Sequence, residues 1–210
     1  MTTDTSTDTS TDIGTVTCDM VMSVDGYVAG VNQRLAEPFG DGPRGRLHRW
    51  MFEQPEQNAA AIEAITAAGA YIMGRNMFGP GRGEWDQTWT GWWGDEPPYH
   101  APTFVLTNHP REPLTMQGGT TFTFVTDGID SALTQARAVA GDRHVAIAGG
   151  ASTVNQYLAA GHIDELRLHV VPVILGAGER LFDGAPDADL EPISVDGNDL
   201  VTHLTYRVLH

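Results

Sequence analysis

Apolar and polar positions along the chain form short blocks that predict strands and helices. Thr15–Met22 is apolar and β-branched, which predicts a strand, and Asp25-Gly26 predicts a turn after it. Arg44–Glu53 predicts a short helix, and the alanine-rich Gln57–Ala68 predicts a stronger one. Ala70–Met73 then predicts a short buried strand, so the chain changes from helix to strand within a few residues.

The same alternation continues toward the C-terminus. Further strands are predicted at Thr103–Thr107, Thr121–Thr126 and His144–Ala148, and helices at Ile129–Ala140 and Ser152–Ala160. Asp164–Leu175 alternates apolar with polar residues and predicts a long strand, in which Pro172 marks an edge or a bend; Leu200–Leu209 predicts the last strand. The pattern predicts an α/β fold with a mostly parallel sheet covered on both faces and an antiparallel C-terminal hairpin at one edge.

Two segments fall outside this periodicity. Residues 1–12 are acidic and of low complexity, which predicts disorder, with a recognition tail as the alternative. The segment 79–98 is rich in Gly and Pro and carries four tryptophans, which predicts a long loop of the kind that often carries function. These tryptophans either cover or stack on a substrate, or form a packing flap or a dimer contact. We expect one domain over residues 13–210.

Charge and cysteine content narrow the choice of partners. The chain has 12 arginines, no lysine and a formal net charge of −15, which argues against nucleic acid and anionic membranes as partners. Cys18 is the only cysteine, and the sequence has no membrane-spanning run or signal-peptide pattern. We therefore expect a cytoplasmic protein that acts on a small molecule.

Three predicted strands end in segments suited to an anionic ligand. Gly149-Gly150 follows a strand and opens a helix, which suits either a pyrophosphate site or a plain tight turn. Arg75 follows another strand and is either a phosphate clamp or half of a surface salt bridge. Leu106–His109 ends a third strand. Because ligands of open α/β sheets bind beyond the carboxyl ends of the strands, the three segments are expected to line one crevice.

The order of these motifs resembles the dihydrofolate-reductase family, over about residues 15 to 208. The resemblance is greatest to the branch that contains the reductase domain of the bifunctional riboflavin-biosynthesis deaminase-reductase. The motifs that carry it are Met22-Ser23-Val24-Asp25-Gly26-Tyr27-Val28-Ala29, Met73-Gly74-Arg75, Val105-Leu106-Thr107, Gly149-Gly150, residues 164–169, Pro172–Gly178 and Leu181-Phe182.

The resemblance implies a three-layer α/β/α fold that binds NADPH and reduces a small substrate, in a homodimer. The segment Gly74, Arg75, Asn76 and Met77 would meet the cofactor phosphates, and Leu106, Thr107 and Asn108 the adenosine ribose and its 2′-phosphate. The pyrophosphate and nicotinamide ribose would lie against Gly149, Gly150, Ala151, Ser152, Thr153 and Val154, with the Gly149–Gly150 bond often cis. Val28 and Ala29 would approach the nicotinamide.

Departures from the family pattern bear on the substrate. The third glycine of the dihydrofolate-reductase cradle is Ala151 here, and the helix predicted at 44–53 offers only Glu53 as the carboxylate that binds a pterin. A zinc deaminase signature is absent. These features favour a ribosylaminopyrimidine-like or small heterocyclic substrate. The alternatives are a dihydrofolate or pterin reductase and a non-catalytic, dimeric NADPH-binding protein.

Candidate proton donors and substrate contacts lie near the first turn and in the tryptophan loop. The acids considered are Asp25, Asp41, His48, Glu84 and Asp86, of which Asp25 ranks first for its place beside the nicotinamide segment. The alternative is that Asp25 only forms an Asx-type turn before Gly26. The substrate candidates are Asp41, His48, Trp50 and Trp85, and a surface position is the alternative for His48. No metal is expected, because the spacing of His48, His100, His109 and Glu53 does not suit one.

Overall fold

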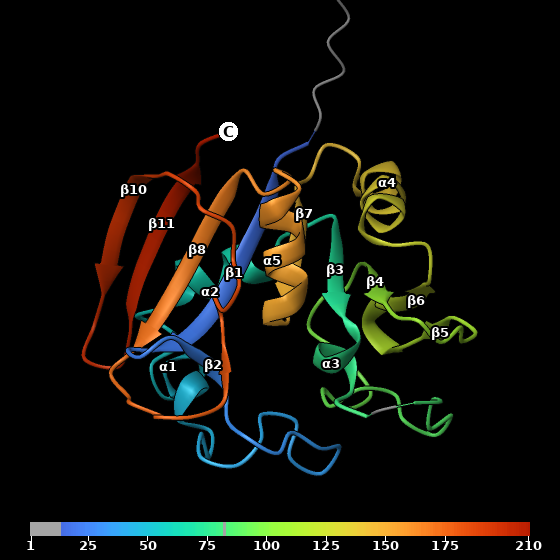
Figure 1. The fold of residues 1–210 in the computed structure, drawn as a ribbon, viewed down its shortest axis with the longest axis horizontal. Helices are drawn as coiled ribbons and strands as arrows, with labels where there is room; N and C mark the ends of the chain where they lie inside the picture. Colours follow the sequence, from blue (N-terminus) through green and yellow to red (C-terminus); the bar gives the residue numbers. More distant parts are fainter. Residues whose placement is uncertain (1–13, 82) are drawn as a thin grey trace, which may run out of the picture.

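A nine-stranded sheet forms the centre of the protein in a computed structural model that describes residues 14–81 and 83–210 (Figure 1). The strand order is β10-β11-β8-β1-β7-β3-β4-β6-β5. The six strands from β8 to β6 are parallel, and β11, β10 and β5 are antiparallel to their neighbours. The predicted α/β class, with a mostly parallel sheet and an antiparallel C-terminal hairpin, is confirmed.

The strands of this sheet are β1 (Val16–Ser23), β3 (Ala70–Gly74), β4 (Pro102–Leu106), β5 (Leu114–Thr115), β6 (Thr121–Val125), β7 (Val145–Gly149), β8 (Glu165–Val171), β10 (Leu190–Gly197) and β11 (Thr202–Val208). A separate antiparallel pair joins β2 (Tyr27–Ala29) to β9 (Glu179–Arg180). The helices are η1 (Arg46–His48), α1 (Arg49–Glu53), α2 (Ala59–Thr66), α3 (Arg75–Phe78), η2 (Gln117–Gly119), α4 (Ile129–Ala140) and α5 (Ala151–Ala159).

Alternating side chains assign the two faces of the sheet to different layers. Successive strand residues point to opposite faces, so Ile72 packs with α4 and α5 while its neighbours Tyr71 and Met73 pack with the tryptophan loop. On that second face, α1 and α2 cover the half of the sheet formed by β1, β8 and β11, and Val171 meets Leu47 there. Helices therefore cover both faces, as Figure 1 shows.

Several boundaries differ from the sequence-based expectations. The strand expected over 164–175 ends at Val171, because Pro172 has no N–H to continue the ladder. The helix expected over 44–53 is η1 followed by α1, with a break at His48. Strands β2, β5, β9 and β10 were not predicted individually; every residue of β10 is exposed, so no apolar alternation marks it. The expectation of disorder for residues 1–12 lies outside the described residues.

No helix within residues 14–81 and 83–210 is long and apolar enough to cross a membrane.

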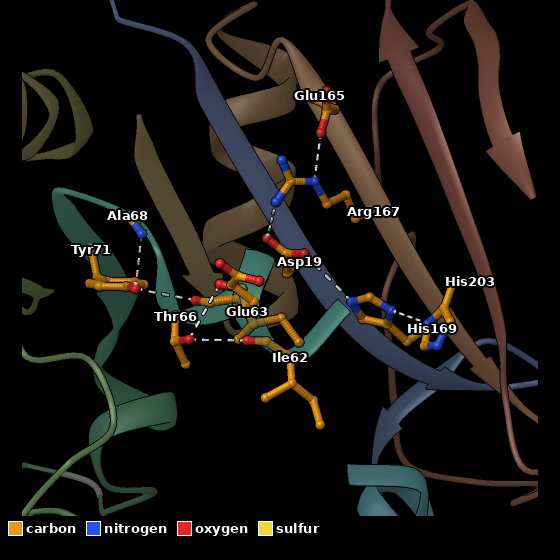
Figure 2. Close-up of polar contacts among 11 residues, drawn as sticks. Asp19, Ile62, Glu63, Thr66, Ala68, Tyr71, Glu165, Arg167, His169 and His203 are labelled. Carbon is orange, nitrogen blue, oxygen red and sulfur yellow. Dashed lines mark hydrogen bonds and ion pairs between the residues drawn. The ribbon is translucent and has the colours of Figure 1, made fainter. Parts of the chain in front are cut away.

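A polar chain from Asn58 through His203 and His169 to Asp19 lies between the sheet and helices α1 and α2, and Figure 2 shows its part from His203 to Asp19. Asn58 donates its amide hydrogens to the carbonyls of Trp50 and Gln54, so its oxygen accepts from Nε2 of His203 at 3.0 Å. A neutral His203 then accepts at Nδ1 from Nδ1 of His169, 2.7 Å away. His169 presents Nε2 to Asp19 at 3.5 Å. The backbone contacts of Asn58 thus turn its oxygen toward His203 and set the tautomer of a neutral His203.

Two histidines, His203 in this chain and His48 near its His169, predict a loss of stability in mild acid. Burial first, and the charge of His169 second, lower the pKa values of His48 and His203 to about 4. Both histidines are therefore neutral in the folded state but titrate near pH 6.5 in the unfolded chain, so the unfolded chain binds more protons between these values. We expect the free energy of unfolding to fall as the pH falls from about 6.5 to about 4.

Urea unfolding at pH 7, 6 and 5 measures this effect. The experiment needs high salt. Acidification reduces the net charge of −15 and so the repulsion within the folded protein, an opposing effect that salt screens. The proton uptake on unfolding near pH 5 should be smaller by about one in a His203→Phe variant than in the wild type. Stability that is independent of pH over this range would contradict the account.

Candidate functional site

The carboxyl ends of β3, β4 and β7 meet at a cleft of about 450 Å³. Parallel strands end at the same edge of a sheet, so segments far apart in sequence come together there. Nine of the residues proposed for the cofactor line the cleft: Gly74, Arg75, Asn76, Leu106, Thr107, Asn108, Gly150, Ser152 and Thr153. The three strand-end motifs therefore form one crevice.

The first turn of α5 opens toward this cleft. Its N-cap is Gly150, whose carbonyl accepts from the N–H groups of Thr153 and Val154. The N–H groups of Ala151 and Ser152 remain for a ligand, and the helix dipole adds partial positive charge. The Gly149–Gly150 bond is cis, as the resemblance implied. This geometry suits a phosphate group.

Close packing joins the two halves of the cleft at Gly74. A Cβ atom on Gly74 would lie 2.3 Å from Oγ1 of Thr153 and 3.7 Å from N of Gly150. The end of β3 therefore lies directly against the start of α5. A side chain at position 74 would force the two apart.

Arg75 packs against the indole ring of Trp85 at the cleft. Its guanidinium lies 4.0 Å from the ring centre of Trp85, and burial lowers its pKa from the ordinary value. Trp85 is only 8% exposed and donates to the carbonyl of His109 at 2.7 Å. Nε of Arg75 is buried and has no hydrogen-bond partner among the described residues. Arg75 is therefore a positioned cation with unused donor capacity.

A second cavity of about 920 Å³ adjoins the cleft. The loop 30–33, the exposed side of α5 and the segment 178–184 enclose it. Asn76, Ser152, Gln156 and Glu179 line both spaces. Two ligands bound in them would therefore lie side by side.

Comparison with known protein families identifies the family of this chain. The profile of the RibD C-terminal domain matches residues 14–202. The chain belongs to the RibD C-terminal domain family. A search of curated protein sequences gave no significant match.

Solved structures confirm the fold of this RibD C-terminal domain. A protein from Shewanella sp. PV-4 assigned to riboflavin biosynthesis superposes with a TM-score of 0.66 at 21% identity, over 94% of this chain and 99% of the other. The riboflavin biosynthesis reductase of Saccharomyces cerevisiae gives 0.56 at 14% identity, over 94% and 90%. Dihydrofolate reductase from Enterococcus faecalis, complexed with NADP(H), gives 0.54 at 16%, over 93% and 97%.

The remaining residues proposed for the cofactor do not line the cleft. Ala151 lines the adjoining cavity, and Val154 and Ala29 are buried at 0% and 3% exposure. Val28 packs on the apolar core shared with α5. Met77 places its sulfur 3.9 Å from a Cβ built on Gly149.

Asp25 requires a correction as the candidate proton donor. Its carboxylate accepts from Oγ of Ser23 at 2.6 Å and from the backbone N–H groups of Leu175 and Gly176 at 3.1 and 2.7 Å. The Ser23 hydrogen bond, aided by the two backbone donors, lowers the pKa of Asp25 to about 2. An ionised carboxylate has no proton to give at neutral pH. Its hydrogen bonds instead connect residues 175–176 to the turn that follows β1.

The four proposed substrate contacts do not line either cavity. Trp50 is fully buried between the sheet and α1, with its ring 5.2 Å from that of His169, so its assignment as a substrate contact is wrong. Trp85 packs its ring against the guanidinium of Arg75. His48 packs on Phe39, with ring centres 4.7 Å apart. Asp41 pairs with Arg34 at 2.8 Å.

Sequence reasoning missed several residues that do line the two spaces. Glu179 and Gln156 line both, and Arg180 and Asp183 line the larger cavity. The β2–β9 pairing brings Glu179 opposite Ala29, a contact that needs the tertiary fold. His109 was not missed, because it ends the third strand motif, and it lines the cleft. The helical position of Gln156, one turn after Ser152, was the only sequence signal for that residue.

Arg75→Ala tests the phosphate contact predicted for this cation. We expect NADPH affinity to fall by roughly tenfold or more, because a charge-assisted hydrogen bond contributes about 1.5–3 kcal/mol. Calorimetric titration of NADPH into both proteins measures the change. Arg46→Ala removes an exposed arginine that donates to the nearby carbonyls of Pro43 and Gly42, outside the cleft, and should leave affinity unchanged. Equal affinities in wild type and Arg75→Ala would place the phosphates elsewhere.

Proposed function

We propose that this protein is an NADPH-dependent reductase of a ribosylaminopyrimidine-like or small heterocyclic compound. The observation that carries the proposal is the continuity of the two spaces. A cleft with a positioned arginine and an open helix N-terminus runs directly into a larger polar cavity. A nucleotide in the first would place its reactive ring toward a substrate in the second.

The residues of the cleft suit the phosphates of the cofactor. Arg75 supplies positive charge, and Ser152 and Thr153 supply hydroxyl groups. Thr107 and Asn108 lie at the end of β4, where the ribose and its 2′-phosphate are proposed to bind. When bound, the nicotinamide supplies the hydride. The protein's own part is to hold both molecules in register and to exclude water from the space between them.

The ion pair of Glu53 on α1 favours a pyrimidine-type substrate over a pterin. Glu53 is the carboxylate there, and it forms a two-point ion pair with Arg49, at 2.7 Å and 2.8 Å, on the exposed side of the helix. A carboxylate engaged in this way is not directed at the cleft. Similarity to structures that carry riboflavin-biosynthesis names supports the same choice.

Loss of NADPH absorbance on addition of substrate tests the proposal. We expect oxidation that requires both the protein and a 5-amino-6-(ribosylamino)uracil-type compound, and none with dihydrofolate. Oxidation with dihydrofolate alone would favour the pterin alternative. Saturable NADPH binding without oxidation of any compound of either class would favour a non-catalytic binding protein.

The homodimer remains a prediction. The edge strand β10 is exposed along its whole length, including Val195 at 69% and Ile193 at 48%, and such edges often pair with another chain. The mass in solution decides between one chain and two.

A further inference from the structure

The tryptophan loop, described at residues 79–81 and 83–98, directs its indole groups to the protein itself. None of its four tryptophans is among the described residues that line the cleft or the larger cavity. Three of the indole N–H groups donate to backbone carbonyls: Trp85 to His109 (2.7 Å), Trp89 to Phe78 (2.9 Å) and Trp92 to Met77 (2.8 Å). This arrangement suits support of the cleft better than stacking on a ligand.

Trp85 contacts the segments that follow two neighbouring strands. The guanidinium of Arg75, after β3, lies 4.0 Å from the centre of the indole ring. It also donates from Nη2 to the carbonyl of Glu84, the residue before Trp85, at 3.3 Å. The indole Nε1 donates to the carbonyl of His109, after β4. Because β3 and β4 pair in parallel, their ends lie side by side, and one rigid side chain spans them.

The carbonyl of His109 also belongs to a closed turn at the end of β4. Oγ1 of Thr107 donates to this carbonyl at 3.3 Å and accepts from the N–H of His109 at 3.1 Å. Thr107, Asn108 and His109 line the cleft, and the first two are the predicted contacts of the ribose and its 2′-phosphate. The indole N–H of Trp85 therefore holds the turn that presents these groups.

The contacts of Trp85 are buried, whereas the other side-chain contact between the loop and the cleft is exposed. Trp85 is 8% exposed, and its ring packs edge-on against Phe78 and Phe124, with ring centres 5.6 Å and 5.1 Å away. The carboxylate of Glu84 pairs with Nδ1 of His109 at 3.1 Å, but this side chain is 91% exposed. Exposed ion pairs contribute little, so we assign the positioning to the indole.

We propose that Trp85 is a positioning residue for cofactor binding. Its ring face holds Arg75 and its N–H holds the turn after β4, so one side chain sets the spacing between two sets of predicted phosphate contacts. A donor that is already fixed in place loses less freedom when it binds a phosphate. Trp85 does not line the cleft itself and acts through the residues that do.

This inference deepens the proposed function and rests on it for the identity of the cofactor, NADPH. It assigns a role to the tryptophan loop, which the reductase proposal leaves open. The loop supports the cleft from outside its lining, so its effect on affinity should depend on Arg75 and on the turn after β4.

Two substitutions separate the ring contact from the N–H contact. Trp85→Phe and Trp85→Leu both lack the indole N–H and differ in the aromatic ring, so the difference between their NADPH affinities measures the ring. Calorimetric titration should show that Trp85→Leu binds NADPH about threefold more weakly than Trp85→Phe. In an Arg75→Ala background the two variants should bind equally, because the ring acts through Arg75. The same difference in both backgrounds would overturn the inference.

The step from the wild type to Trp85→Phe measures the N–H contact. It leaves the carbonyl of His109 with the Thr107 hydroxyl as its remaining donor among the described residues. NADPH affinity should fall about twofold or more, and the loss should persist in the Arg75→Ala background. NADH lacks the 2′-phosphate and should lose less affinity. Equal NADPH affinities of the wild type and Trp85→Phe would overturn the assignment of the N–H.

Trp93 supplies the matched control in the same loop. Its ring stacks on those of Trp92 and Phe122, with centres 4.6 Å and 5.7 Å away. None of its ring contacts within the described residues involves Arg75 or residues 107–109. Trp93→Phe and Trp93→Leu should therefore bind NADPH equally. A difference as large as that at Trp85 would reduce the effect to general packing and overturn the inference.

Thermal unfolding of each variant establishes that it is folded at the titration temperature. Trp85→Met fills more of the same space and replaces Trp85→Leu if the leucine variant is unfolded there. The comparison with Trp85→Phe in both Arg75 backgrounds then proceeds unchanged, with the same expected and contradicting results.

Failure of the reductase proposal gives a different result. If the variants bind NADPH in the expected order but NADPH is never oxidised, the reductase chemistry is wrong and the role of Trp85 stands. If NADPH is oxidised with a ribosylaminopyrimidine while the wild type, Trp85→Phe and Trp85→Leu bind it equally, the reductase proposal stands and the role of Trp85 is overturned. No saturable binding of NADPH to the wild type at millimolar concentration would overturn both.

Discussion

Replacing Gly74 with alanine is expected to lower NADPH affinity by about tenfold or more and to destabilise the fold by about 1–3 kcal/mol. The new Cβ would lie 2.3 Å from Oγ1 of Thr153, a side chain that is itself buried. Relief requires either a rotation of Thr153 out of the cleft or a separation of β3 from α5. Both changes disturb the surface proposed to meet the pyrophosphate. Calorimetric titration and urea unfolding measure the two losses.

Two further variants show whether this contact is the cause. Gly81→Ala adds the same methyl group to a residue of the cleft lining where nothing lies within 4 Å, and it should change neither quantity appreciably. Thr153→Ala removes the clashing oxygen. The double variant Gly74→Ala/Thr153→Ala should then be more stable than the sum of the single effects predicts, which reports coupling between the sites. Strict additivity would show that the two residues do not press on each other.

Trp50→Ala is expected to cost about 3–5 kcal/mol of folding free energy, as for other large buried aromatic residues. Trp50 has no exposed surface and lies against both histidines of the buried chain, with ring centres 5.2 Å from His169 and 5.0 Å from His203. Its removal opens a cavity beside a polar cluster that cannot collapse without losing hydrogen bonds. Urea unfolding at pH 7 measures the cost.

The same helix offers the control for this substitution. Phe52 lies on α1 two residues later and is 81% exposed, so Phe52→Ala should change stability by less than about 0.5 kcal/mol. Trp50→Phe should keep NADPH affinity at the wild-type value, because Trp50 lines neither cavity. A cost for Trp50→Ala no larger than that for Phe52→Ala would contradict the packing role.

Elements whose apolar residues recur at a regular helical or strand spacing could be predicted from the sequence. The helix expected over Ile129–Ala140 has these bounds in the structure, because Leu133, Ala136 and Ala140 recur on one face and are buried. β10 shows the opposite case. Its eight residues are all exposed, and it is a strand only because β11 pairs with it. Pairing of this kind depends on the partner and leaves little trace in local hydrophobicity.

The lining of the cleft at the strand ends was also largely predictable, and that of the larger cavity was not. Strand ends in a parallel sheet meet at one edge, so Gly74, Thr107 and Gly150 could be placed together from sequence order alone. Asp183 reaches the larger cavity through a turn after β9, a two-residue strand without a sequence signal. Trp50 was misplaced because an aromatic residue near a predicted cleft fits core and surface equally well from sequence.

Titration of the wild-type protein with NADPH tests the central claim, that the crevice at the ends of β3, β4 and β7 binds this cofactor. Trp85 lies directly beneath Arg75 there, so its fluorescence should report occupancy. We predict a saturable change in tryptophan fluorescence. The melting temperature should rise with it, since a ligand at about 100 times its Kd stabilises the folded state by about 2.7 kcal/mol. Unchanged fluorescence and an unchanged melting temperature at millimolar NADPH would contradict the account.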